Sequence, residues 1–322
     1  MSDFRLGTRG SPLALYQAHA VATAIAVASG RSCEIVIIKT SGDRLTDVSL
    51  AEIGGKRLFV KEIEDALLEG RIDLAVHSSK DMPAVLPDGL DVAATLPRED
   101  ARDALVLPDG ARPVDLDAVL AHLGQHPRIG TSSVRRVAQL NTVFERATFA
   151  PIRGNLDTRL RKLDSGDYDA IVLASAGLKR LQYGARISAL IPVQACVPAP
   201  GQGIIAVEIR ADDRGLQEIM ASIDDRASHV ALDAERALVV TLGGGCQMPI
   251  GGHAVVEHET VVLTGLVASL DGARVVRAET RGALSEAKDV GARAARELLA
   301  AGAGAILHEV AAGNNVAGGQ RA

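Results

Sequence analysis

The amino-acid sequence predicts two α/β domains that flank a cleft, followed by a smaller C-terminal α+β domain. Segments with the hydrophobic patterns of strands and helices alternate along 4–77 and again along 103–174. Residues 193–202 are rich in turn-forming proline and glycine, and a further strand-like run follows at 204–209. Such alternation is typical of largely parallel sheets. The late strand indicates that the chain crosses more than once between the two domains, an arrangement suited to closure over a ligand.

The first series begins with a strand at 4–8, a helix at 11–29 and a strand at 33–40. Ser11 and Pro12 suit the start of the helix, because a serine side chain accepts a hydrogen bond from a free N–H group there and proline has no N–H to satisfy. Residues 33–40 carry a near-continuous run of β-branched side chains, as strands of parallel sheets do. We therefore expect a β-α-β unit.

A polar turn closes this series. Residues 41–56 combine glycine with charge and show no period, so we expect a mobile loop there. A helix then ends at Gly70, and a strand at 74–77 runs into the polar segment 78–83. Open α/β sheets bind ligands at the carboxyl ends of their strands, so segment 78–83 is a candidate binding turn.

The second series has strands near 105–107 and 170–174, with two candidate anion sites between them. Residues 131–133 open one helix, and residues 153–155 precede another. The start of a helix offers free N–H groups and a positive dipole, both of which favour anions.

Beyond Asp212 the pattern changes to helices, then to strands with a hairpin turn at Asp271-Gly272, then to a helix near 285–300. These features predict the third domain. The expected divisions are 1–98 with 199–215 for domain 1, 99–198 for domain 2, 216–313 for domain 3, and a flexible tail at 314–322.

Composition excludes several classes of protein. The net charge of −5 and the aromatic content of 2% argue against non-specific nucleic-acid binding. Three widely spaced cysteines without a C-x-x-C pair indicate neither a disulfide framework nor a zinc site, and no other metal site is expected. A reducing compartment fits this cysteine usage.

The N-terminus imitates a secretory signal, because Arg5 and Arg9 precede an apolar run. Tyr16, Gln17 and His19 interrupt that run, so we expect a helix of the mature protein and a cytoplasmic location. No stretch approaches the roughly 20 apolar residues that span a membrane, and no membrane partner is expected.

Arginines recur at or just after the ends of predicted strands. In a parallel sheet these ends converge on one side, and a guanidinium binds a carboxylate through two hydrogen bonds. Several such groups around one cleft predict a substrate with many carboxylates or phosphates, although any one of them could equally be a solvated surface residue. The six are Arg9, Arg135, Arg136, Arg153, Arg159 and Arg180.

Two further features could carry chemistry. Asp81 stands beside Lys80 at a strand end, where surrounding positive charge would keep it ionised and able to stabilise a cation. Cys246 stands between two glycine clusters, on a loop that something large can approach. Each has a simpler alternative, an aspartate–lysine pair in a turn and a buried cysteine that only packs.

Taken together, these stretches resemble the porphobilinogen deaminase family, also called hydroxymethylbilane synthases. The similar stretches occur in order and cover nearly the whole chain short of the tail. They include Gly7-Thr8-Arg9-Gly10-Ser11-Pro12, Gly54-Gly55-Lys56, Ala75-Val76-His77-Ser78-Ser79-Lys80-Asp81-Met82-Pro83, Gly130-Thr131-Ser132-Ser133-Val134-Arg135-Arg136, Arg153-Gly154-Asn155, Ala176-Gly177-Leu178-Lys179-Arg180, Gly201-Gln202-Gly203 and Gly244-Gly245-Cys246.

The resemblance implies two α/β domains of periplasmic-binding-protein-like topology, a third domain, and a monomer. It implies a transferase that couples four porphobilinogen molecules head to tail with loss of ammonia, after which water releases hydroxymethylbilane. It also implies a dipyrromethane cofactor joined to Cys246 by a thioether. A thiolate is a good nucleophile toward an electrophilic methylene carbon, so the chemistry of Cys246 is consistent with that role.

The resemblance also implies roles for individual residues. Asp81 and Lys80 are the implied catalytic residues, and a fixed carboxylate can stabilise the cation that deamination creates. The implied cofactor-binding residues are Cys246, Lys80, Asp81, Thr131, Ser132, Ser133, Arg135, Arg136 and Gly154. The implied substrate-binding residues are Arg9, Ser11, Ser78, Arg153, Asn155, Arg159, Arg180 and Gln202.

One departure and one rival interpretation remain. Arg57 replaces a glycine that is usual in the family, so the loop there could approach substrate differently. A two-domain binding protein for an organic polyanion would also place arginines in a cleft, but it would need neither Cys246 nor a third domain.

Overall fold

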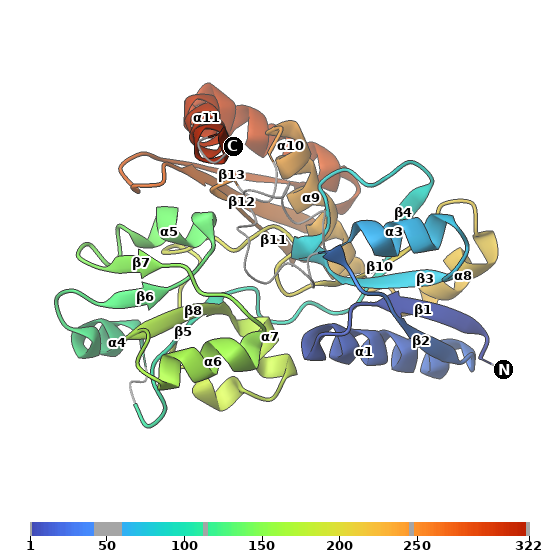
Figure 1. The fold of residues 1–322 in the computed structure, drawn as a ribbon. Helices are drawn as coiled ribbons and strands as arrows, with labels where there is room; N and C mark the ends of the chain where they lie inside the picture. Colours follow the sequence, from blue (N-terminus) through green and yellow to red (C-terminus); the bar gives the residue numbers. More distant parts are fainter. Residues whose placement is uncertain (1, 42–59, 112–114, 245–247, 320–322) are drawn as a thin grey trace.

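The computed structural model describes residues 2–41, 60–111, 115–244 and 248–319, with side chains up to residue 312. Two five-stranded sheets and one three-stranded sheet each carry their own helices. Figure 1 shows the two larger α/β units side by side and the three-stranded unit above them. The expected fold class, two α/β units and a smaller C-terminal α+β unit, is confirmed.

The first sheet has the strand order β2-β1-β3-β10-β4. Strand β1 pairs in parallel with β2 and β3, whereas β10 runs antiparallel to β3 and β4. Helices α1 and α8 pack on one face and α3 contributes to a separate cluster with Ala75 and Leu90. The bounds are β1 (Phe4–Thr8), α1 (Pro12–Ser29), β2 (Cys33–Ile37), α3 (Lys61–Leu68), β3 (Leu74–Ser78), β4 (Leu90–Thr95), β10 (Ile205–Arg210) and α8 (Arg214–Ile223).

The second sheet repeats this plan with the order β7-β6-β8-β5-β9. Strand β6 pairs in parallel with β7 and β8, and β5 is the antiparallel strand beside β8. In each sheet, the strand that the chain enters after crossing between the units runs antiparallel beside the third parallel strand. This strand is β10 beside β3 in the first sheet and β5 beside β8 in the second. The bounds are β5 (Asp103–Val106), α4 (Leu116–Leu123), β6 (Arg128–Gly130), α5 (Val134–Leu140), β7 (Thr148–Ala150), α6 (Leu156–Asp164), β8 (Ala170–Ala174), α7 (Ser175–Arg180) and β9 (Ala189–Leu190).

The third sheet is an antiparallel meander packed against two helices. Leu238 of α9 and Leu298 of α10 belong to one core cluster with Leu263 of the central strand. Helix α9 precedes the sheet, while α10 and α11 follow it (Figure 1). The bounds are α9 (Arg226–Thr241), β11 (Ile250–Glu257), β12 (Thr260–Ala268), β13 (Val275–Ala283), α10 (Ala287–Ala300) and α11 (Ala303–Gly319).

Two segments of the chain cross between the α/β units, one from β4 to β5 and the other from β9 to β10. These two crossing segments contact each other. The N–H of Glu99 donates to the carbonyl oxygen of Gly203 over 3.1 Å. Gly203 has φ +88°, and a Cβ atom there would lie 2.2 Å from the carbonyl oxygen of Glu99. Only glycine allows both this backbone angle and this close approach.

Helix α9 ties the third unit to both crossing segments. Glu235 is 0% exposed, and its carboxylate accepts from Arg98 Nη1 over 2.6 Å and from the N–H of Gly201 over 2.6 Å. It also accepts from the N–H of Ala254 in β11 over 2.7 Å. A buried carboxylate needs this full set of donors, and here the donors come from both crossings and from the third sheet.

Several element-level expectations can be compared with the structure. Ser11 caps α1 by accepting from the N–H of Ala14, as its position predicted. Strand β4 was not expected at all. Helix α11 runs through residues 314–319, which the sequence assigned to a tail.

Within the described residues, α1 is the one helix long and apolar enough to cross a membrane by length and composition. This is weak evidence, because the core helix of a soluble protein passes the same test. Ala18, Val21 and Ile25 of α1 are fully buried in the core of the first unit.

Candidate active site

The polar segment after β3 forms a tight turn, as expected from its place at a strand end. Residues Ser79–Asp81 make one turn of 3-10 helix, and the N–H of Met82 donates to the carbonyl oxygen of Ser79 over 3.1 Å. Gln17 of α1 donates to Ser78 Oγ over 2.7 Å. The start of the turn is therefore held by a side chain of α1, the first helix of the chain.

The second crossing segment packs directly on this turn. The N–H of Ser79 donates to the carbonyl oxygen of Ile204 over 3.0 Å. Gly201 has φ +75°, and a Cβ atom there would lie 2.6 Å from Ser79 Oγ and 2.9 Å from the backbone nitrogen of Lys80. The backbone that carries Lys80 and Asp81 is thus held where the two α/β units join.

Gln202 links the two units through its side chain. Lys80 Nζ of the first unit donates to Gln202 Oε1 over 3.3 Å. Gln202 Nε2 donates to Asp103 Oδ1 of the second unit over 2.9 Å and to the carbonyl oxygen of Ala101 over 2.6 Å. Since Gln202 is 1% exposed, its amide serves protein groups in this structure.

Asp103 is the centre of a buried charge cluster that sequence reasoning missed. It is 0% exposed and accepts from Arg135 Nη2 over 2.7 Å and from Arg136 Nη2 over 2.7 Å. Burial alone would raise the pKa of Asp103, but the two guanidinium groups hold this pKa well below its usual range. The sequence gives only a weak signal for this role, because Asp103 ends a run of charged residues and such runs are usually exposed to solvent.

Arg135 and Arg136 are also buried, and much of their donor capacity is satisfied within the second unit. Arg135 Nη1 donates to the carbonyl oxygen of Val197 over 2.7 Å and lies 3.2 Å from Cys196 Sγ. Arg136 Nη1 donates to the carbonyl oxygen of Val172 over 2.8 Å. Burial raises the pKa of Cys196 to about 12, so this thiol stays protonated.

Arg159 lies on α6 of the second unit, and its Nε donates to the carbonyl oxygen of Gly154 over 2.9 Å. Burial, and to a smaller extent the positive charge of Arg136, lowers the pKa of Arg159 to about 10, and the negative charge of Asp81 opposes this change. The charges of Asp81, from the first unit, and of Arg136, from the second, therefore both interact with that of Arg159. A guanidinium remains charged near pH 7 even with this pKa, so the pair of arginines presents positive charge to the site.

At the two helix starts that the sequence offered as anion sites, those of α5 and α6, a side chain of the protein caps the helix. Ser133 Oγ accepts from the N–H of Arg136 at the start of α5. Asn155 Oδ1 accepts from the N–H of Thr158 over 3.0 Å at the start of α6. Gly154 has φ +106° beside this cap. Ser132 Oγ both donates to the carbonyl oxygen and accepts from the N–H of Ile152, at 2.9 and 3.0 Å.

The remaining candidates lie at the crossing segments and just after the carboxyl ends of the strands β1, β6 and β7. Arg180 Nη2 donates to the carbonyl oxygen of Gly203 over 2.8 Å, and burial lowers the pKa of Arg180. Arg9 and Arg153 are half-buried. Thr131 is buried, and its Oγ1 accepts from the N–H of Ser133 over 3.2 Å.

Three features expected from the sequence lie outside the described residues. These are Cys246, Arg57, and the loop at 41–56 apart from Ser41. Cys246 follows α9 in the chain and precedes β11. Among the described residues, no group of histidine, cysteine and acidic side chains could hold a metal ion.

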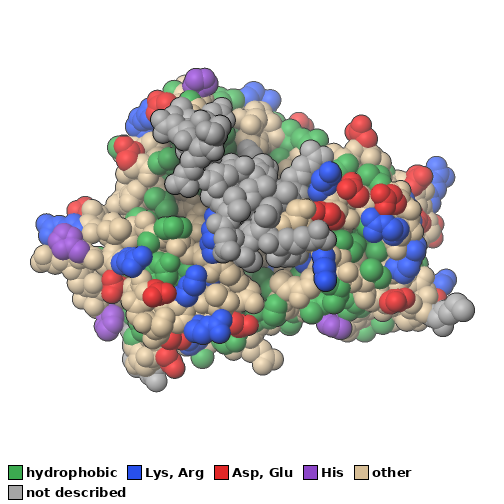
Figure 2. Space-filling view, in the orientation of Figure 1, with side chains coloured by type: hydrophobic (Ala, Val, Ile, Leu, Met, Phe, Trp, Pro, Cys, Tyr) green, Lys and Arg blue, Asp and Glu red, His purple; other side chains and the backbone are tan. Residues whose placement is uncertain are grey.

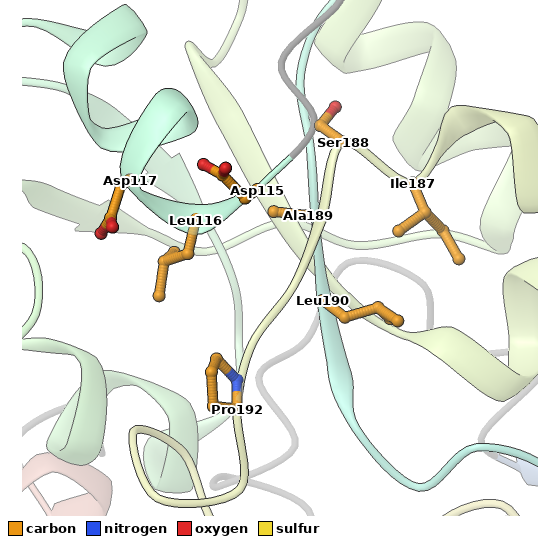
Figure 3. A pocket seen from close by; sticks show the side chains of 8 residues that line it. All are labelled: Asp115, Leu116, Asp117, Ile187, Ser188, Ala189, Leu190 and Pro192. Carbon is orange, nitrogen blue, oxygen red and sulfur yellow. The ribbon is translucent and has the colours of Figure 1, made fainter.

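A cavity of about 570 Å³ lies away from this site, at the edge of the second sheet. Its lining comes from the start of α4 and from segment 187–192, and it includes Asp115 and Asp117 (Figure 3). No candidate site residue lines it, and carboxylate groups would repel an anionic ligand. On the face drawn in Figure 2, acidic and basic side chains of the described residues are interspersed.

Comparison with known protein families shows to which family the chain belongs. The model described as "Porphobilinogen deaminase, dipyromethane cofactor binding domain" matches residues 4–218, and the model of the C-terminal domain matches residues 230–300. The chain belongs to the porphobilinogen deaminase family. It is a transferase that condenses porphobilinogen on a dipyrromethane cofactor and makes hydroxymethylbilane in tetrapyrrole biosynthesis.

Curated relatives extend this result over nearly the full length. The porphobilinogen deaminase of Syntrophobacter fumaroxidans is 46% identical over 95% of this chain and 97% of its own. That of Moorella thermoacetica is 48% identical over 97% of this chain and 98% of its own. The alternative of a polyanion-binding protein is not favoured.

Solved structures with a similar arrangement include periplasmic domains. The periplasmic VFT2 domain of Bordetella pertussis BvgS has a TM-score of 0.41 at 17% identity and covers 68% of this chain and 86% of its own. The second substrate-binding domain of a putative amino acid ABC transporter from Streptococcus pneumoniae has a TM-score of 0.43 at 14% identity and covers 74% and 98%. The fold class rests on the sheet orders described above.

Proposed function

We propose that Asp81 is the catalytic carboxylate of the condensation and that Lys80 assists it. The observation that supports this most is the position of their turn, which is fixed by a crossing segment of the chain and lies within electrostatic reach of Arg159 from the other unit. A carboxylate held in this way needs no reorganisation when positive charge develops beside it.

The chemistry requires this charge. Loss of the amino group as ammonia leaves a cation delocalised over the pyrrole ring and its methylene carbon, and that carbon then bonds to the free ring carbon of the growing chain, which loses a proton. Asp81 stabilises the cation, and Lys80 keeps a positive charge beside acidic substituents. The arginines of the second unit bind those substituents, because a guanidinium matches a carboxylate in shape and charge.

We propose that the cofactor is attached to Cys246 through a thioether. Bound there, it supplies a covalent primer on which the chain is built. Its carboxylates require cationic and neutral donors, and the site offers this donor set. The proposed cofactor-binding residues are Lys80, Asp81, Thr131, Ser132, Ser133, Arg135, Arg136 and Gly154. The buried Nε of Arg135 lacks a hydrogen-bond partner among the described residues, which leaves one donor of this set available.

The proposed substrate-binding residues are Arg9, Ser11, Ser78, Arg153, Asn155, Arg159, Arg180 and Gln202. Within this set, Ser11 and Asn155 also cap helices, and Gln202 also bridges Lys80 and Asp103. These groups therefore act partly by shaping the site. Arg159 is the member of this set whose charge interacts with that of Asp81, the proposed catalytic carboxylate.

Substitution of Asp81 tests the proposal. In Asp81→Asn, the cation loses its counter-charge, and we expect kcat to fall by roughly 100-fold or more while covalent cofactor is retained. Asp81→Glu keeps the charge at a changed position and should lose less. Steady-state kinetics with porphobilinogen and the intact mass of each variant measure the two effects. Wild-type kcat in Asp81→Asn would overturn the assignment.

We also propose that the domains follow the three sheets. Helix α8 supports an end of the first domain at 223 rather than 215, because Leu216 and Met220 pack in the core of the first unit. A monomer in the cytoplasm is the proposed state, and the odd number of widely spaced cysteines, which indicates no disulfide framework, supports a reducing compartment. Light scattering of the purified protein would test the monomer.

A further inference from the structure

A second residue of α9, next to Glu235, reaches from the third unit into the first. Arg236 Nη2 donates to the carbonyl oxygen of Ala84 over 2.9 Å. Ala84 follows Asp81 by three positions, so this bond holds the chain just after the proposed catalytic turn. The contact joins residues 152 positions apart in the sequence, so it comes from the tertiary fold and not from the local structure of the turn.

The chain just before the turn is held by a buried pair. His77 Nε2 lies 3.0 Å from Glu208 Oε2, and both side chains are buried, with Glu208 0% exposed. The pair joins β3 to the antiparallel strand β10. Among the described residues, Glu208 Oε1 has no hydrogen-bond partner. A buried carboxylate with one unpartnered oxygen depends on nearby positive charge.

Arg236 supplies positive charge near Glu208. Burial lowers the pKa of Arg236, and among the acidic groups that oppose this change Glu208 has the largest effect, ahead of Asp233, Asp91 and Glu64. The Arg236 guanidinium thus bonds the chain after the turn, and its charge also interacts with that of the carboxylate that holds His77 before the turn.

The same face of α9 also packs against the turn itself. Leu232 lies four residues before Arg236, and such positions lie on one face of a helix. Leu232 belongs to one buried cluster with Met82, which follows Asp81, and with Ile204 of the crossing segment. Helix α9 therefore packs on the chain directly after the turn through an apolar residue, Leu232, and a cationic one, Arg236.

We propose that Arg236 is a positioning residue for Asp81, acting from the third unit through Ala84 and through the Glu208–His77 pair. The inference rests on the proposed role of Asp81. Helix α9 ends at Thr241 and Cys246 follows it in the chain, so one helix contacts the chain just after the proposed catalytic turn and leads to the proposed attachment point. Arg236 itself touches neither substrate nor cofactor in this account.

Kinetics of Arg236→Gln test the proposal. We expect this variant to carry its covalent cofactor and to show a kcat reduced by roughly 10-fold, because small displacements of a reacting group reduce rate strongly. The KM for porphobilinogen should stay within twofold. Arg236→Lys keeps the charge and one donor, and should recover part of kcat. Arg226→Gln, on the exposed first turn of the same helix, is the matched control and should match the wild type.

A double-mutant cycle separates positioning from a general structural effect. If Arg236 acts through Asp81, the loss caused by Arg236→Gln should shrink at least threefold in the Asp81→Glu background, where the carboxylate is already displaced. Independent, multiplicative losses would overturn the proposal, as would wild-type kcat in Arg236→Gln. If Arg236→Gln does not fold, the same cycle with Arg236→Lys decides.

The two proposals fail in different ways. If Asp81→Asn keeps the wild-type kcat, the role of Asp81 falls whatever Arg236 does. If Asp81→Asn is inactive while Arg236→Gln is unaffected, only the positioning role of Arg236 falls.

Discussion

At the residue scale, one buried carboxylate organises the basic wall of the site. Asp103 binds Arg135, Arg136 and Gln202, and Gln202 in turn accepts from Lys80. Taking these charges out of water is costly, and each becomes tolerable only because the others are present. The arginines are therefore held in place before any substrate carboxylate arrives, which reduces the entropy lost on binding.

Removing that carboxylate should destabilise the fold. In Asp103→Asn, two guanidinium groups remain buried without their counter-charge, and we expect a loss of about 3–5 kcal/mol in the free energy of unfolding. The exposed pair of Glu69 and Arg71 provides the control, since Glu69→Gln should cost less than about 1 kcal/mol. Urea unfolding of both variants measures the difference. Equal losses would show that Asp103 is not the centre of a coupled cluster.

The pH dependence of this effect has a definite sign. The pKa of Asp103 is lower in the folded protein than in the unfolded chain, where it is about 4. Its contribution is therefore present above about pH 4 and is lost as the pH falls from there toward the folded value. The stability difference between wild type and Asp103→Asn should accordingly be constant near neutral pH and shrink in acid.

Some of the site could be predicted from the sequence and some could not. Asp81 and Lys80 stand at the end of a recognisable strand, so their place in the sheet indicated a site. Asp103 stands at the end of a charged run with Arg98, Glu99 and Arg102, which reads as a solvated linker. Its burial depends on Arg135 and Arg136, more than thirty positions away, and no local pattern encodes that distance.

At the element scale, α9 connects the three units. It bonds both crossing segments through Glu235 and the chain just after the proposed catalytic turn through Arg236, and it packs Leu238 in the core of the third unit. A helix was expected here, but its partners were not. The helical period shows which face is apolar, and it does not show what covers that face.

The start of α9 should respond to pH through His229. Its Nδ1 lies 2.9 Å from Asp224 Oδ1, and the hydrogen bond with Asp224 raises the pKa of His229, with smaller contributions from Asp233 and Asp91. This contribution to stability is present below the unfolded pKa of about 6.5 and is lost as the pH rises through the folded pKa.

Comparison with a variant isolates this effect. Wild type should exceed His229→Gln in stability by up to about 1 kcal/mol at pH 5.5, and the difference should shrink by pH 8.5. Thermal unfolding at both pH values measures it, and His308→Gln, an exposed histidine, should show no such change. A difference that grows with pH would contradict the assignment.

Elements with strong end signals were predictable, and weakly patterned ones were not. Ser11 and Pro12 marked the start of α1, and the structure shows the cap. Strand β4 was missed because its six residues include Asp91 and two alanines, and it depends on pairing with β10, which follows more than a hundred residues later. Strand pairing over such a separation is set by the tertiary fold.

At the scale of the whole molecule, the two crossing segments control how the α/β units meet. They meet at Gly203, whose carbonyl oxygen accepts a hydrogen bond from the N–H of Glu99. The same oxygen accepts from Nη2 of Arg180, a candidate substrate-binding residue. A change at this point would alter the crossing and the site together.

Gly203→Ala should therefore be more damaging than an alanine at a matched glycine. Gly166 has φ +86°, close to the +88° of Gly203, but a Cβ atom at 166 would meet nothing within 4 Å. Gly166→Ala should cost about 1–2 kcal/mol from backbone strain alone. Gly203→Ala should cost at least about twice as much, because its Cβ would also displace the Glu99 carbonyl, and should lower kcat. Equal losses in urea unfolding, with unchanged kcat, would show that the crossing tolerates movement.

The central claim is that this chain builds its product on a primer covalently attached at Cys246, in a site whose catalytic turn carries Asp81. The most direct measurement is the intact mass of the denatured wild type and of Cys246→Ala, each before and after incubation with porphobilinogen. The account predicts an excess of two linked pyrrole units on the wild type and the bare chain mass for Cys246→Ala. A wild-type mass that stays at the bare chain after incubation, or an adduct that persists in Cys246→Ala, would contradict it.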